Sequence, residues 1–241
     1  RNYFFIGLLL LLGGANLAFH LAMAGALALD VRGVLQVALD VLAFIMALMA
    51  GRVVPMFTAN ALRGVRPLQR AWLERAAPAV LAALVVADLA APAAAAAIAG
   101  AAAIIHGWRL ALWQPQATRR TPILWVLHVA YAWIVVYLGL RALTGVGFAP
   151  AGIATHALTV GALGGLTLGM MTRTARGHTG RPLVAGRAEV ACYVLINLAA
   201  IARVGGPLAL PAHAQAAIVL SGVLATAAFA VFTLRFTPIL T

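Results

Sequence analysis

Long apolar runs, separated by short clusters of arginine, proline or glycine, repeat along the whole chain. A run of about 20 apolar residues is long enough to cross the hydrocarbon core of a bilayer as an α-helix. The pattern predicts eight spans, over residues 3–26, 33–50, 71–91, 93–112, 121–143, 153–172, 187–204 and 213–234. The expected fold is therefore an all-α, polytopic transmembrane helical bundle, with residues 1–241 forming one transmembrane domain.

Composition excludes the other classes of protein. Hydrophobic residues make up 64% and charged residues 9% of the 241 residues, and the mean hydropathy is +1.02. A soluble domain carries roughly a quarter charged residues, and a disordered chain is poor in apolar residues. The single cysteine, Cys192, allows neither an intrachain disulfide nor a thiolate zinc cluster. The sequence contains no glycine-rich phosphate loop and no Ser-His-Asp arrangement, so nucleotide binding and nucleophilic hydrolysis have no support.

The basic residues divide unequally between the two sides of the expected membrane. The formal charge is +12, and every one of the 17 basic residues is an arginine. Eight spans place Arg32, Arg141 and Arg203 on one side. They place fourteen arginines on the other: Arg1, Arg52, Arg63, Arg66, Arg70, Arg75, Arg109, Arg119, Arg120, Arg173, Arg176, Arg181, Arg187 and Arg235. Because positively charged loops stay in the cytoplasm, both ends of the chain are expected there. The arginines thus indicate a lipid bilayer as partner and not nucleic acid.

Polar side chains inside the predicted spans are candidates for function, because placing them in lipid is costly. Asn16 and His20 are four residues apart and share a helix face. His20 and His156 fall at similar depth toward the outer side, whereas His128 falls toward the cytoplasmic side. The full set is Asn16, His20, Asp40, Asp88, His106, His128, His156, Glu189 and Asn197.

Each of these groups also has a structural interpretation. Neutral imidazole binds haem iron and copper, but a histidine between helices can equally hydrogen-bond its neighbours. Asp40 suits a proton relay, and it suits a buried pair with an arginine or a backbone hydrogen bond equally well. Asp88 and Glu189 lie near span ends and are expected at the interface. His106 and His213 are expected to be solvated or to serve packing.

Two local patterns could suit a flat ligand. Trp125 and Tyr131 flank His128, as in the wall of a macrocycle site, although an interfacial aromatic belt is the alternative. Glycines at residues 161, 165 and 169 form a stripe of small side chains. Such a stripe favours close helix packing, with a surface for a ligand plane as the alternative.

Two arginine-containing segments, Gly51–Asn60 and Gly169–Pro182, are more specific than membrane topology requires. Both are expected to be cytoplasmic loops, and the loop from residue 52 to residue 70 is expected to be the longest segment outside the membrane. Arg52 and Arg181 could clamp an anionic group such as a haem propionate. Loop folding and contact with lipid headgroups are the alternative roles.

At these segments the chain resembles the NnrS family of bacterial inner-membrane proteins. The resemblance also rests on Asn16–His20, Leu127–Trp133 and Thr155–Gly161. It is longest and most specific between His156 and Pro182, and it covers essentially the whole chain.

The resemblance implies a protein that contains haem and copper and acts in the response to nitric oxide and nitrosative stress. Family members have about twelve spans, so the chain is expected to be the C-terminal two-thirds of such a protein. The absent N-terminal spans, which carry a Trp-His-x-His-Glu-Met motif in the family, are then expected as partners. The matched positions are His20, His128, His156, His178, Arg52, Asn60, Arg173 and Arg181.

The matched histidines divide into two expected sites. His20 and His156 are expected to belong to an outer metal or haem site, and His128 to a second site nearer the cytoplasm. His178 is a further candidate metal ligand. A transporter or exporter of a small molecule or metal complex is the alternative function.

Overall fold

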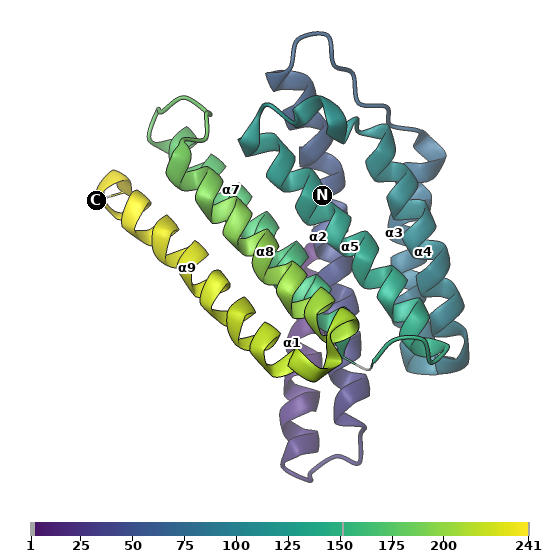
Figure 1. Ribbon diagram of the computed structural model, residues 1–241. Helices are drawn as coiled ribbons and strands as arrows, with labels where there is room; N and C mark the ends of the chain where they lie inside the picture. Colours follow the sequence, from purple (N-terminus) through teal and green to yellow (C-terminus); the bar gives the residue numbers. More distant parts are fainter. Residues whose placement is uncertain (1–2, 151, 241) are drawn as a thin grey trace.

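The computed structural model describes residues 3–150 and 152–240, which contain helices and no strand (Figure 1). The helices up to the centre of the chain are α1 (Tyr3–Met23), α2 (Val31–Ala61), α3 (Ala71–Ala90), α4 (Pro92–Leu112), the 3-10 turn η1 (Pro115–Thr118) and α5 (Pro122–Gly145). They are followed by α6 (Ile153–His156), η2 (Ala157–Leu163), α7 (Gly164–His178), α8 (Arg187–Ala209), the 3-10 turn η3 (Pro211–His213) and α9 (Ala214–Leu240).

These elements confirm the predicted all-α transmembrane bundle. Because α6, η2 and α7 are continuous, the described residues form eight long rods. Seven of the rods in this part of the chain are long and apolar enough to cross a membrane. The remaining helix, α3, carries Glu74, Arg75 and Asp88, and it packs against both α2 and α4.

Helix α2 is longer than predicted and corrects the assignment of Gly51–Asn60 to a loop. The segment is the last third of α2, with Pro55 inside the helix. Proline has no N–H for the carbonyl four residues earlier, which here belongs to Gly51. The side-chain amide of Gln69 donates to that carbonyl instead, at 3.3 Å. The connection outside the helices is therefore only residues 62–70.

The rod from Ile153 to His178 contains a second departure from the prediction. Its η2 segment is π-helical, with seven residues wound more widely than an α-helix. The rod also continues past residue 172, so His178 is the last residue of α7 and does not lie in a loop. Helices α8 and α9 likewise end later than predicted, and α8 includes Pro207.

Helix α5 lies at the centre of the bundle and contacts α2, α4 and the η2–α7 rod. Its Tyr131, Ile134 and Tyr137 side chains are completely buried. The predicted glycine stripe packs directly on it: a Cβ on Gly161 would meet Trp133, one on Gly165 would meet Ala130, and one on Gly169 would meet Leu127. The packing interpretation of the stripe is thereby confirmed. Helices α8 and α9 form the flank visible at the left of Figure 1.

The two ends of the bundle differ in charge. The arginine-rich end, at the top of Figure 1, holds the connections 62–70, 113–121 and 179–186. The opposite end holds the connections 24–30 and 210–213, together with residues 146–150. Arg32, Arg141 and Arg203 lie toward the opposite end, and the other described arginines lie toward the arginine-rich end. Arg1, which the sequence places with the latter group, lies outside the described residues.

Candidate functional site

His128 lies in the first half of α5, near the arginine-rich end, and only 2% of it is exposed. Its Nδ1 lies 3.1 Å from the Leu124 carbonyl, which can only accept a hydrogen bond, so Nδ1 carries the proton. Its Nε2 lies 3.5 Å from Thr58 Oγ1, whose own proton goes to the Val54 carbonyl at 2.9 Å. Nε2 therefore faces a hydroxyl oxygen that can only accept, and the His128 ring also forms a hydrogen bond with the Trp113 backbone. A ring nitrogen of a neutral imidazole can bind a metal, but both ring nitrogens of His128 have polar neighbours in this structure.

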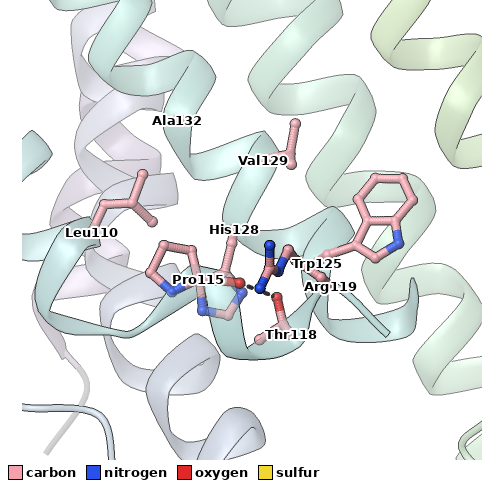
Figure 2. A pocket seen from close by; sticks show the side chains of 8 residues that line it. All are labelled: Leu110, Pro115, Thr118, Arg119, Trp125, His128, Val129 and Ala132. Atoms are coloured by element: carbon pink, nitrogen blue, oxygen red, sulfur yellow. Dashed lines mark hydrogen bonds between the residues drawn. The ribbon is translucent and has the colours of Figure 1, made fainter. Parts of the chain in front are cut away.

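A groove of about 480 Å³ runs past His128 on the outer side of α5 (Figure 2). Its wall is mostly apolar; among its polar side chains, Arg119 is exposed, and Thr118 is buried and donates to the Pro115 carbonyl (Figure 2). The full lining is Leu110, Pro115, Thr118, Arg119, Trp125, His128, Val129 and Ala132. Trp125 is thus part of this wall, as the macrocycle interpretation requires, while Tyr131 turns the other way into the core. The groove suits an apolar ligand with an anionic edge near Arg119.

His20 and Asn16 lie exposed on α1, one helical turn apart. The ring of His20 makes an edge-to-face contact with Phe19 at 5.4 Å between ring centres. Neither side chain is hydrogen-bonded to another described residue. Only 6% of the spanning part of α1 is buried. An uncompensated amide and imidazole thus occupy the surface of a transmembrane helix, where such groups are costly.

His156 is half-buried at the start of the α6–α7 rod, toward the opposite end. Its Nε2 accepts a hydrogen bond from Arg203 Nη2 of α8 at 2.9 Å. Helix α1 packs chiefly on α2, whereas α6 packs on α5 and α8. The packing contacts of the described residues therefore do not bring His20 and His156 together, and their common site stays a prediction.

The two arginine-containing segments meet at the arginine-rich end. The Arg173 guanidinium of α7 stacks on the Phe57 ring of α2, with its central carbon 3.7 Å from the ring centre. This cation–π contact joins two segments far apart in sequence. Arg52, Arg181 and His178 are exposed at the same end. The clustering is consistent with clamping an anion and equally with contact to lipid headgroups.

Beneath these segments lies a buried network of hydrogen bonds and one ion pair that the sequence did not predict. Arg109 forms an ion pair with Glu74 and donates to the Ala47 carbonyl at 3.1 Å and to the Tyr131 hydroxyl at 3.2 Å. The Tyr131 hydroxyl in turn lies 2.6 Å from His106 Nδ1, and His106 Nε2 donates to a backbone carbonyl. His106 is fully buried, so its packing role is correct and its solvated alternative is wrong. The absence of a side chain at Gly51 leaves the space that the guanidinium occupies.

The acidic residues of the spans are paired with arginines. Glu189 lies in the first turn of α8, is 1% exposed, and pairs with Arg176 at 2.5 Å and with Arg235 at 3.6 Å. Asp88 pairs with Arg141, which also binds Asp40. Arg141, four residues after Tyr137 on α5, is the one arginine inside that predicted span and could have suggested the partner. No sequence signal identifies the opposing helix.

The described residues do not gather a multidentate metal site. No group of three or more His, Cys, Asp or Glu side chains in residues 3–150 and 152–240 could hold one metal ion. The candidate ligands are instead separate imidazoles on α1, α5, α6 and α7. Each could supply one bond to a haem iron, which accepts axial ligands from different helices.

Comparison with known proteins agrees with the architecture. No curated protein and no solved structure matches the chain. A family model described as NnrS protein matches residues 1–241. The match extends over every helix and every candidate residue described above, and the chain therefore belongs to the NnrS family.

Proposed function

We propose that the protein is a haem- and copper-binding protein of the bacterial inner membrane that acts in the response to nitric oxide and nitrosative stress. In this proposal the arginine-rich end and both chain ends face the cytoplasm, as the distribution of arginines favours. Family membership supports the general assignment. The observation that carries it within this chain is the unpaired imidazole of His20 on the exposed surface of α1.

The residues present fit haem better than they fit copper. His20 has an accessible ring, and Asn16 on the same face is a second polar group that could hydrogen-bond a ligand. Bound haem supplies an iron atom at which nitric oxide can bind. The histidines of the described residues lie apart from one another, so each could supply only one ligand to a copper ion. A copper site would therefore need further ligands.

His128 is the candidate for the second site. Its Nε2 is the potential ligand, because Nδ1 lies 3.1 Å from the Leu124 carbonyl, and Arg119 is placed to pair with an anionic edge of a molecule in the groove. Thr58 stands 3.5 Å from Nε2, so the side chain of Thr58 has to move for any ligand to bind this nitrogen. His128 is therefore proposed as a conditional ligand, and His20 as the primary one.

The test is the optical spectrum of the purified holoprotein, reduced and then exposed to nitric oxide. We expect a haem band that shifts with nitric oxide, and we expect His20→Ala to lose the haem or change its ligand-field bands. His213→Ala is the matched control, because His213 is an exposed histidine toward the same end of the bundle. Identical spectra for His20→Ala and the wild type would remove His20 from the site. A folded preparation without haem would overturn the cofactor assignment.

A further inference from the structure

The acidic side chains inside the bundle differ in the number of arginines that pair with them. Glu74 has Arg109 as its partner, and Glu189 has two arginines nearby. Asp40 and Asp88, by contrast, share the single guanidinium of Arg141. If both carboxylates were ionised, this cluster would hold one uncompensated negative charge inside the membrane.

That charge would be almost completely shielded from water. Asp40 lies in the third turn of α2, and Asp88 lies two residues before the end of α3. Asp40 is 1% exposed, and the Asp88 side chain is 10% exposed. An isolated ionised carboxylate in an apolar interior is strongly unfavourable, and two carboxylates that share one site avoid full ionisation by retaining a proton.

The deeper burial of Asp40, 1% exposed against 10% for the Asp88 side chain, indicates that Asp88 keeps the charge. Arg141 binds Asp88 through one nitrogen, Nη2, at 2.8 and 3.0 Å from the two oxygens. Its other nitrogen, Nη1, lies 2.9 and 3.1 Å from the oxygens of Asp40. Asp40 is also hydrogen-bonded to the hydroxyl of Tyr137, and the oxygen of this hydroxyl can instead accept a hydrogen bond from a protonated Asp40. Asp88 with Arg141 then forms a neutral pair, and the more deeply buried Asp40 becomes neutral by protonation.

A route to this cluster opens at the opposite end of the bundle. A cleft of about 530 Å³ is lined by residues of α2, α5 and α6, including Arg32, Gln36, Arg141 and Thr144. Gln36 forms the link from the cleft to the cluster: its amide nitrogen is 2.9 Å from the Tyr137 hydroxyl and 3.2 Å from Asp40. Polar atoms thus continue from the cleft to the buried carboxyl group.

The surroundings favour a proton over a metal cation as the occupant. The donors of Arg141, Gln36 and Tyr137 already converge on the Asp40 oxygens, and a guanidinium repels a second cation. The other titratable groups at this end of the adjoining elements are Asp30, which caps α2, Arg32 in the cleft, His20 exposed on α1 and His156 engaged with Arg203. The part of α4 that lies at this end, residues 92–105, contains no titratable side chain.

We propose that Asp40, Asp88, Arg141 and Tyr137 form a proton-binding site that holds one exchangeable proton and is reached from the opposite end of the bundle through the cleft at Gln36. The site is independent of the histidines assigned to haem or copper. It provides a place where a proton can be taken up from, or returned to, the aqueous phase on that side of the membrane.

Infrared difference spectroscopy of the full chain in lipid nanodiscs tests this proposal without the cofactors. The wild type is expected to show the C=O stretching band of a protonated carboxylic acid near neutral pH, and this band should shift in D₂O. Asp40→Asn should lose the band. Asp88→Asn should lose it too, because Asp40 then has Arg141 to itself and ionises. Glu189→Gln is the matched control, since it removes a buried carboxyl group that has sufficient arginine, and it should keep the band.

Three results would overturn the proposal: no exchangeable carboxyl band in the wild type, full retention of the band in Asp88→Asn, or its displacement by sodium or potassium ions at constant pH. The wild-type measurement needs no variant, so it decides the first point even if a substitution impairs folding. Access is tested with Thr144→Cys, since Cys192 is buried. Attachment of a bulky maleimide at residue 144 should slow hydrogen–deuterium exchange of the band, and an unchanged rate would contradict the route.

Discussion

At the scale of single residues, polarity inside a span could be predicted from the sequence, but its partner could not. His128, Asp40 and Glu189 are each conspicuous in apolar runs, and the structure buries all three. Their environments depend on which helices adjoin, and this is not a local property of the sequence. The arginine beside Glu189 lies on another helix, so the sequence near Glu189 could not predict this partner. Local spacing could predict only the shared face of Asn16 and His20.

Arg109 provides a test of how much one buried ion pair stabilises the bundle. Arg109→Gln leaves Glu74 without its cation and removes the donors to Ala47 and Tyr131. Breaking a buried pair by removing one partner costs about 3–5 kcal/mol; we expect the lower end, because the Glu74 side chain is 23% exposed.

The measurement is thermal unfolding followed by a thiol-reactive dye, which reads the exposure of the buried Cys192. Arg119→Gln is the matched control, because Arg119 is exposed and its Nε donates only to the nearby Gln116 carbonyl. Equal midpoints for the two variants would show that the pair with Glu74 contributes little.

At the scale of elements, the apolar runs predict where helices cross the membrane but not where they end. Proline and glycine suggested that Gly51–Asn60 is a loop, whereas the structure continues α2 through it, because Gln69 replaces the missing hydrogen-bond donor of Pro55. That compensation comes from residues outside the helix and leaves no pattern in the segment itself. The role of the glycine stripe, by contrast, could be predicted, since small residues spaced four apart on a helix allow a neighbouring helix to pack closely.

The contact between α7 and α5 predicts a steric effect at Gly165. A Cβ at this position would lie 2.8 Å from the Ala130 Cβ and 3.5 Å from its Cα, so the two helices would have to separate. We expect Gly165→Ala to lower the free energy of unfolding by about 1–3 kcal/mol.

Gly222→Ala is the control, because a Cβ at residue 222 of α9 meets nothing within 4 Å. Alanine should be neutral or stabilising there, by up to about 1 kcal/mol. The fraction of protein that stays monodisperse after heating, measured by size-exclusion chromatography, compares the variants. A Gly165→Ala variant as heat-stable as Gly222→Ala would contradict the tight packing.

At the scale of the whole molecule, the division of the arginines between the two ends of the bundle could be predicted from the sequence, because it depends only on the order of the spans. The structure places the described arginines toward the ends that this order predicts, although several helix boundaries moved. Composition likewise fixed the class of protein. The site could not be predicted as well from the sequence. His20, His128 and His156 lie on three separate helices, and the distances between them depend on how all the helices pack.

The proposed orientation predicts which loops can be labelled in intact cells. Phe148 is 83% exposed in the connection at the opposite end, and Leu183 is 41% exposed in a connection at the arginine-rich end. A membrane-impermeant maleimide added outside the inner membrane should label Phe148→Cys and not Leu183→Cys. The buried Cys192 gives no background. The reverse pattern would show that the arginine-rich end faces outward.

The π-helical turn η2 sets the azimuth of His156 relative to α7. It lies between His156 and the α7 helix that packs on α5. An α-helix turns by about 100° per residue, and a π-helix turns by less because its hydrogen bonds span five residues. If the same seven residues wound as an ordinary α-helix, His156 would rotate about the rod relative to α7 and would lose its position beside Arg203. A change of winding in this turn would thus act as a rotational switch that presents this histidine to different neighbours.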